Sequence, residues 1–182
     1  MFHYLKLMLQ ILMAPKRGWE DVEAEGETAR LTLLRGLLPL VAVASLTVGV
    51  GALYELHPSF SRLLIQAVVI FVRYVISYFI GVAVLTYALP RLTLDGLVNR
   101  ERVELFCAYC VGMMAIIGIL QNLLPMELTL LQFLVIWVLA VIFQGRTFLD
   151  VGEQNIFRFA AFSIIGIILP VYLIDWLLLP AA

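Results

Sequence analysis

Residues 63–89 read LLIQAVVIFVRYVISYFIGVAVLTYAL, and almost every side chain in this stretch is apolar. At ~1.5 Å of rise per residue, a helix of this length would reach about 40 Å and exceed the ~30 Å hydrocarbon core of a bilayer. We therefore expect a membrane-spanning helix that tilts or protrudes. Arg73 interrupts the stretch. An ionisable group at this depth costs about 3 kcal/mol or more unless it pairs or reaches the interface, so Arg73 is the first residue to explain.

The whole chain has the composition of an integral membrane protein. Of its 182 residues, 63% are apolar and 14% are charged, against about 45–50% and about 25% in soluble domains. This length allows one domain of several spans and no appended soluble module. The net charge of -1 carries little information, and the sequence has no basic patch for nucleic acid.

Residues 1–14 predict an amphipathic helix that lies in the membrane interface. His3, Lys6 and Gln10 share one helical face, and the segment is too short to span. The apolar residues expected to enter the acyl region are Phe2, Leu5, Leu9 and Leu12. A signal peptide is the alternative, but Pro15 directly follows the small-residue cleavage candidate.

A basic, aromatic elbow follows at residues 15–19, PKRGW. We expect Trp19 at the ester level of the lipids and Lys16 and Arg17 at anionic phosphates, worth ~1 kcal/mol per base. The alternative is a flank that only sets topology. The acidic segment that follows is typical of a solvated helix face. Residues 1–34 are thus predicted to form a cytoplasmic interfacial helix and elbow.

Four more apolar runs bring the predicted number of spans to five, so the fold class is an all-α, polytopic membrane bundle. The predicted spans are residues 36–54, 63–89, 105–124, 128–143 and 159–179, within a transmembrane domain of residues 35–182. The fourth run is near the lower length limit for a span. The connection around Pro125 is so brief that the third and fourth spans must form an antiparallel hairpin.

The distribution of Lys and Arg predicts the orientation. Ten of the 12 fall in the amino-terminal segment and in alternate connections, whereas the opposite side has only Arg62 and Arg73 lies within a span. Because basic residues are retained in the cytoplasm, we expect the amino terminus inside and the carboxyl terminus outside. The ten are Lys6, Lys16, Arg17, Arg30, Arg35, Arg91, Arg100, Arg102, Arg146 and Arg158.

Three segments resemble the Yip domain family of small five-span membrane proteins. They are ILMAPKRGWEDV before the first span, LLPL at its start, and FCAYCVGMMAIIGILQNLLP in the third span. The resemblance covers nearly the whole chain and implies five spans with an inside amino terminus. Eukaryotic members are associated with Rab-type GTPases and vesicle traffic. This chain has a very short arm without an Asp-Leu-Tyr-Gly-Pro motif and is more similar to bacterial members, so the resemblance makes a GTPase partner doubtful and implies a bacterial inner membrane. The matching positions, which have no known chemical role, are Pro15, Gly18, Trp19, Pro39, Tyr109, Gly112 and Pro125.

Candidate catalytic and metal-binding residues are few, and we predict neither an enzyme nor a cofactor. Cys107 and Cys110 form a C-x-x-C pair, but they lie in an apolar run on the reducing side and are interpreted as small core residues. His3 and His57 would lie on opposite sides of the membrane. No phosphate loop, zinc-helix motif or nucleophile elbow occurs.

Two functional classes remain open. The first is a non-enzymatic protein that acts through contacts with lipids, with other membrane proteins or with itself. The second is a small transporter or channel protomer whose pathway includes Arg73 and Asp175. We predict that these two residues pair, because the helix rise places them about 5 and about 6 Å below the outer surface. Gln66, Gln121 and Gln132 are the other polar span residues considered.

Overall fold

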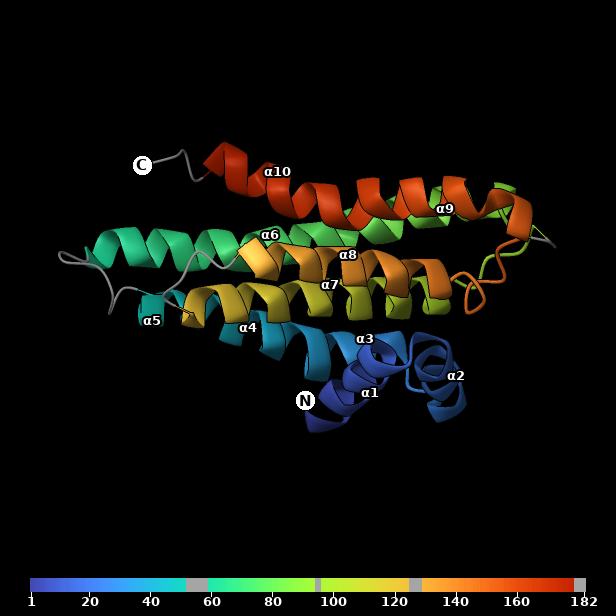
Figure 1. Ribbon diagram of the computed structural model, residues 1–182, viewed down its shortest axis with the longest axis horizontal. Helices are drawn as coiled ribbons and strands as arrows, with labels where there is room; N and C mark the ends of the chain where they lie inside the picture. Colours follow the sequence, from blue (N-terminus) through green and yellow to red (C-terminus); the bar gives the residue numbers. More distant parts are fainter. Residues whose placement is uncertain (52–58, 94–95, 125–128, 179–182) are drawn as a thin grey trace.

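The computed structural model describes residues 1–51, 59–93, 96–124 and 129–178, with only the backbone for 129–133. Within these residues the chain is all helical, apart from an isolated antiparallel bridge between Thr93 and Val151. The long helices run side by side along one axis (Figure 1). Pro125 and His57 lie outside the described residues.

Among the described residues, four helical stretches are long and apolar enough to cross a membrane, which confirms the prediction of an all-α protein with several apolar helices. They are Ala29–Val50, Phe60–Arg91, Arg100–Leu123 and Glu153–Leu178. The elements that compose them are α3 (Ala29–Thr32), η1 (Leu33–Leu37), α4 (Leu38–Leu46), α5 (Val48–Gly51), α6 (Phe60–Ala88), η3 (Leu89–Arg91), α7 (Arg100–Leu123), η4 (Glu153–Asn155), α9 (Ile156–Ser163), η5 (Ile164–Ile168) and α10 (Leu169–Leu178). The first stretch begins before residue 34, so the domain boundary predicted between residues 34 and 35 falls inside a helix.

The fourth predicted span, residues 128–143, corresponds to α8 (Thr129–Gln144), a helix of 16 residues. It lies beside α7 and returns along it (Figure 1). This helix is shorter than the four candidate spans, so the count of five stays a prediction.

Two membrane-length helices contain a π-helical turn two residues before a proline. The turn η1 precedes Pro39, and η5 precedes Pro170. Proline has no N–H, and its ring clashes with the carbonyl group four residues earlier. A wider turn removes this clash, because it increases the spacing of the backbone around that carbonyl. Proline in the sequence therefore explains why both helices deform without ending.

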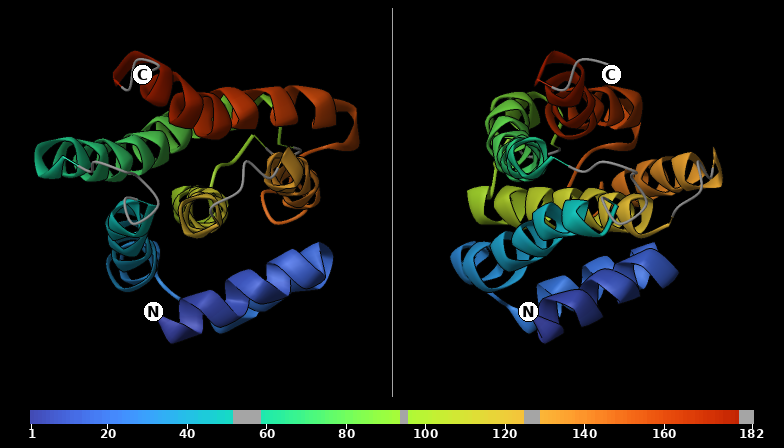
Figure 2. Two further views of the ribbon diagram at one scale, coloured as in Figure 1. Left: turned by 60° about the vertical axis from the view of Figure 1, so that its left-hand side comes forward. Right: turned by 90° about the vertical axis from the view of Figure 1, so that its left-hand side faces the viewer.

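The helix α7 is the centre of the bundle, with α4, α6 and α8 packed around it (Figure 2). Its residues from Leu105 to Ala115 are all buried. Small residues allow this close packing: a side chain at Gly118 would overlap the hydroxyl group of Tyr74. The conspicuous sequence of the third predicted span is thus explained by packing on every side.

The helices α1 (Phe2–Met13) and α2 (Pro15–Glu25) form a hairpin that packs across the bundle. Figure 2 shows α1 lying across the long helices when they are viewed near their axes. Gly18 permits the close approach within the hairpin, since a Cβ there would overlap the backbone of Ile11. The buried stripe on α1 consists of Tyr4, Leu7, Met8 and Ile11.

The sequence predicted one polar and one apolar face for α1, and this prediction was partly wrong, because a third face packs against the bundle. Phe2 and Leu9 are exposed as expected, but Lys6 shares their face and does not lie opposite to it. His3 instead approaches Glu25 and Glu27, at 3.3 and 3.5 Å. The residues at positions 4, 7, 8 and 11 follow helical spacing and form the apolar stripe that the sequence interpretation missed.

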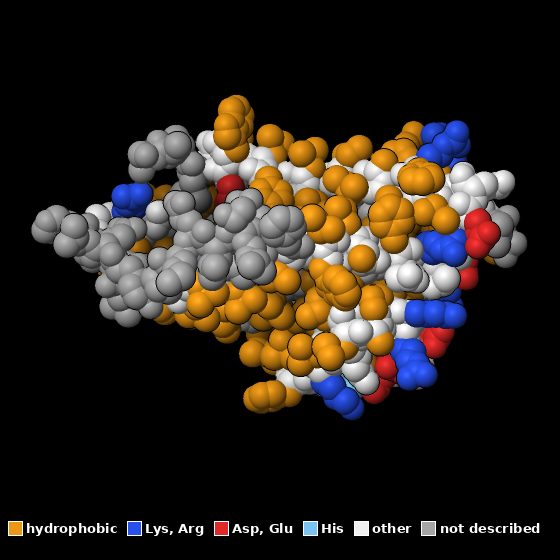
Figure 3. All heavy atoms as spheres, viewed as in Figure 1, with side chains coloured by type: hydrophobic (Ala, Val, Ile, Leu, Met, Phe, Trp, Pro, Cys, Tyr) orange, Lys and Arg blue, Asp and Glu red, His pale blue; other side chains and the backbone are white. Residues whose placement is uncertain are grey.

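Charged side chains gather at one end of the molecule. Figure 3 shows most of the visible Lys, Arg, Asp and Glu side chains at the end where α2 and the α6–α7 and α8–α9 connections lie. Apolar side chains cover much of the remaining surface in this view. This division is typical of a protein whose apolar part faces lipid.

Candidate functional site

Arg73 and Asp175 form an ion pair between α6 and α10, as predicted from the sequence. The guanidinium Nη1 donates to Oδ2 of Asp175. The Arg73 side chain is 10% exposed and that of Asp175 is 31% exposed. Because Arg73 is nearly enclosed, its guanidinium group loses contact with water, and the Asp175 carboxylate offsets the cost of that loss.

Tyr74 extends the pair to α7. The Nη2 of Arg73 donates to the Tyr74 hydroxyl oxygen at 2.9 Å, and that hydroxyl group donates to the carbonyl of Met114 at 3.1 Å. The guanidinium also lies 4.6 Å from the centre of the Tyr74 ring. One buried arginine therefore connects three helices, which together we call the Arg73 network (Arg73, Tyr74, Met114 and Asp175).

The contact between α6 and the last long helix continues away from the ion pair. The Ser77 hydroxyl group donates to the carbonyl of Ile167 in the π-helical turn η5. Next to it, a Cβ at Gly166 would lie 3.1 Å from the Cα of Gly81. Close backbone packing and a satisfied carbonyl hold η5 against α6, so that α10 can present Asp175 to Arg73.

Other polar span residues do not join this network among the described side chains. Gln66 is half-buried on α6 and Gln121 is exposed on α7, while the side chain of Gln132 lies outside the described residues. Arg73 Nε and Asp175 Oδ1 are buried without a partner in the described part of the chain. The site is therefore a closed pair with one spare donor and one spare acceptor.

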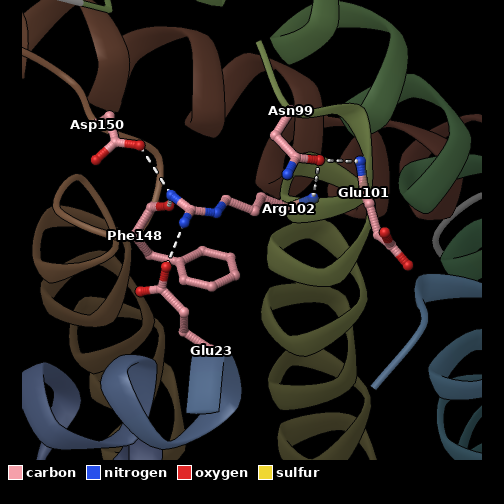
Figure 4. Close-up of polar contacts among 6 residues, drawn as sticks. All are labelled: Glu23, Asn99, Glu101, Arg102, Phe148 and Asp150. Carbon is pink, nitrogen blue, oxygen red and sulfur yellow. Dashed lines mark hydrogen bonds and ion pairs between the residues drawn. The ribbon is translucent and has the colours of Figure 1, made fainter. Parts of the chain in front are cut away.

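A second arginine organises the charged end of the molecule. Arg102 Nη1 donates to Asp150 Oδ2 at 2.8 Å and to the carbonyl of Phe148 at 3.3 Å, and its Nη2 donates to Glu23. Figure 4 shows its guanidinium between the side chains from α2 and from the α8–α9 connection. Asn99 caps α7 by accepting from the backbone N–H groups of Glu101 and Arg102, which fixes the start of the helix that carries the arginine. We call Arg102, Glu23, Phe148 and Asp150 the Arg102 cluster.

The elbow residues divide between surface and core. Lys16 and Arg17 are exposed, as headgroup contact would require. Trp19, by contrast, is 1% exposed, so its predicted contact with lipid headgroups is wrong. Its ring stacks on Phe106 and Phe148, with centroids 5.3 and 5.1 Å away. The indole N–H donates to the carbonyl of Val141 at 3.3 Å, which gives a buried tryptophan the partner that it needs.

Tyr4 attaches α1 to the centre of the bundle, a role that the sequence interpretation did not identify. Its hydroxyl group donates to the carbonyl of Ala108 at 2.7 Å, and its ring stacks on Tyr109 at 4.9 Å. Side chains at Gly36 or Gly112 would overlap it. Burial, with a smaller effect of Tyr109, raises the pKa of Tyr4 well above its usual value, so the hydroxyl group keeps its proton and can donate. The two glycines in otherwise apolar helices were the available sequence signal.

Cys107 and Cys110 are free and buried on α7. Each is fully enclosed, with an exposed fraction of 0%. A Cβ on Gly81 would lie 3.3 Å from the sulfur of Cys107, so the thiol fills space between α6 and α7. This placement fits the interpretation of both residues as small core side chains.

Comparison with known proteins gives no relative for this chain. No protein-family model matches it, and neither curated protein sequences nor solved structures give a match.

Proposed function

We propose that this chain is an integral membrane protein of the Yip type that acts without catalysis, through its contacts with lipid and with other membrane proteins. The observation that carries the proposal is the position of α1. The helix lies across the bundle (Figure 2) and keeps an apolar face exposed. A soluble protein would bury such a face.

The depth of α1 supports contact with lipid. Tyr4 meets α7 at Ala108 and Gly112, which follow Leu105, the start of the apolar run, by three and seven residues. At ~1.5 Å per residue, α1 lies about 5–10 Å inside the apolar part of the bundle. Interfacial helices bury their apolar faces by about this amount. Phe2 and Leu9, at 88% and 55% exposure, would then contact acyl chains.

We further propose five spans, with α8 as the fourth, in a bacterial inner membrane with the amino terminus in the cytoplasm. The 16 residues of α8 would extend about 24 Å, so its ends must reach the interfaces. The orientation is supported by the end-to-end separation of charge in Figure 3. The Yip resemblance rests on the sequence segments alone.

The closed geometry of the Arg73 network favours a structural role over a pathway. A pathway needs several polar side chains around one hydrated space, whereas the hydrogen bonds of Arg73 and Asp175 among the described residues include neither Gln66 nor Gln121. The second candidate function is a proton or ion pathway in a transporter or channel protomer. Its supporting observation is the pair of buried atoms without partners, Arg73 Nε and Asp175 Oδ1.

Cysteine accessibility in proteoliposomes tests the proposed function. In a Cys107→Ala, Cys110→Ala background, single cysteines at Phe2 and Leu9 should resist a water-soluble maleimide, whereas one at exposed Glu20 should react. Equal reaction at all three positions would overturn lipid contact by α1. Ion flux through the same vesicles tests the second candidate: flux that Asp175→Asn abolishes would replace the proposal with a pathway.

A further inference from the structure

The exposed face of α1 carries a shallow apolar groove with two polar groups in it. Its lining residues are Phe2, Leu5, Lys6, Leu9, Gln10 and Met13. Lys6 and Gln10 are one helical turn apart, so their side chains are neighbours. We propose that this groove binds one anionic phospholipid, with an acyl chain along the apolar side chains and the phosphate at Lys6. The inference rests on the proposed lipid contact of α1 and names the class of lipid.

The charge of the groove is uncompensated by protein. No acidic residue occurs in α1, and within the described residues no carboxylate lies within ion-pair distance of Lys6. Its neighbour His3 differs, since it faces Glu25 and Glu27. The four-carbon side chain of a lysine at this depth can extend its ammonium group outward to the headgroup layer, where a lipid phosphate is the anion available to stabilise it.

The side chain of Gln10 indicates which lipid headgroup the groove would prefer. Its side-chain oxygen Oε1 is buried and has no donor among the described residues. A buried acceptor without a donor is costly, by about 1–3 kcal/mol. Because Oε1 is enclosed, the half-buried Gln10 side chain must turn toward the groove to reach a ligand. A headgroup that carries a hydroxyl group next to its phosphate would then supply the donor while Lys6 holds the phosphate. Phosphatidylglycerol has this chemistry, phosphatidic acid has the charge without the hydroxyl, and phosphatidylcholine has no net charge.

The position of the groove favours lipid over a protein partner. The opposite face of α1 is already docked on the bundle through Tyr4, Met8 and Ile11. The groove therefore faces away from the protein, at a depth of about 5–10 Å inside the apolar part of the bundle. Leu31 and Leu34 on the first long helix, which α1 contacts through η1, are exposed as well. A peptide at this depth would have to satisfy its backbone groups without water.

Native mass spectrometry of the full chain, released from nanodiscs that contain phosphatidylglycerol, phosphatidic acid and phosphatidylcholine, tests this site. The wild type should retain phosphatidylglycerol about fivefold better than phosphatidylcholine, the factor that ~1 kcal/mol for one lysine gives. Lys6→Gln should abolish this preference. Gln10→Leu should reduce the retention of phosphatidylglycerol to that of phosphatidic acid. Arg158→Gln removes an exposed base outside the groove and should change nothing.

Three results would overturn the inference. Equal retention of phosphatidylglycerol and phosphatidylcholine would exclude a site that selects anionic lipid. If Lys6→Gln and Arg158→Gln lowered the retention of phosphatidylglycerol equally, the preference would come from the overall positive charge and not from the groove. A second copy of the chain retained in place of lipid would make the groove a protein interface. Maleimide protection of Phe2 and Leu9 separates these failures from failure of the proposed function, because α1 can enter the bilayer without preferring anionic lipid.

Discussion

Two arginines join distant parts of this molecule, and they do so in opposite surroundings. Arg73 has one carboxylate partner and is nearly enclosed. Arg102 has two carboxylates and a carbonyl as acceptors, and its partners Glu23 and Asp150 are 50% and 71% exposed. Where water is excluded, each partner is indispensable, whereas near solvent each can be replaced. The comparison predicts different costs for similar substitutions.

The largest effect is expected from Trp19, which packs directly beneath the Arg102 cluster. Its ring stacks on Phe148, whose carbonyl accepts from Arg102. Trp19→Ala should destabilise the protein by about 4 kcal/mol, because it empties a fully packed position. Thermal unfolding in detergent measures this cost, and Lys16→Ala, an exposed neighbour, should change it little. If Trp19→Ala and Lys16→Ala lowered the stability by the same small amount, the ion pairs of the Arg102 cluster, and not the packing of Trp19, would hold the charged end together.

The next effect is expected from the Arg73 network. Arg73→Leu leaves the Asp175 carboxylate without its cation and should cost about 3 kcal/mol, the lower end of the range for a broken buried pair, since Asp175 is partly exposed. The double variant Arg73→Leu, Asp175→Leu should lose clearly less than the sum of the two single variants. Additive losses in thermal unfolding would show that the two side chains act independently.

The same contrast explains what the sequence could predict. Arg73 and Asp175 are the only charged residues within the five predicted spans, so depth alone was enough to pair them. Arg102 had many possible acidic partners near the amino terminus and in the connections, and nothing in the spacing selected Glu23 and Asp150. The long helices followed from apolar length. The number of spans did not, because α8 lies at the length limit.

Trp19 and Tyr4 show a second limit of sequence interpretation. An aromatic residue beside two bases is typical of a membrane interface, and that pattern predicted the wrong surroundings for Trp19. What decides its burial is a set of rings from distant segments, Phe106 and Phe148. Tyr4 likewise depends on Gly36 and Gly112 in two other helices. Such complementarity is tertiary: the helical spacing of positions 4, 7, 8 and 11 marks a buried face, but it does not show which rings or glycines that face meets.

The smallest effects are expected within the Arg102 cluster, and salt separates them from those of Arg73. Arg102→Gln should cost about 1 kcal/mol, and Glu23→Gln or Asp150→Asn about half as much, because the remaining acceptor and water take over. Asp150 has a φ of 54°, a conformation that Asn also tolerates, so Asp150→Asn removes charge without adding strain.

Raising the ionic strength from about 0.1 to about 1 M should screen these exposed pairs and lower the stability cost of all three substitutions, while the cost of Arg73→Leu stays constant. Thermal unfolding of the four variants at both salt concentrations measures this difference. A cost of Arg102→Gln that equals that of Arg73→Leu and does not respond to salt would show that burial does not distinguish the two arginines.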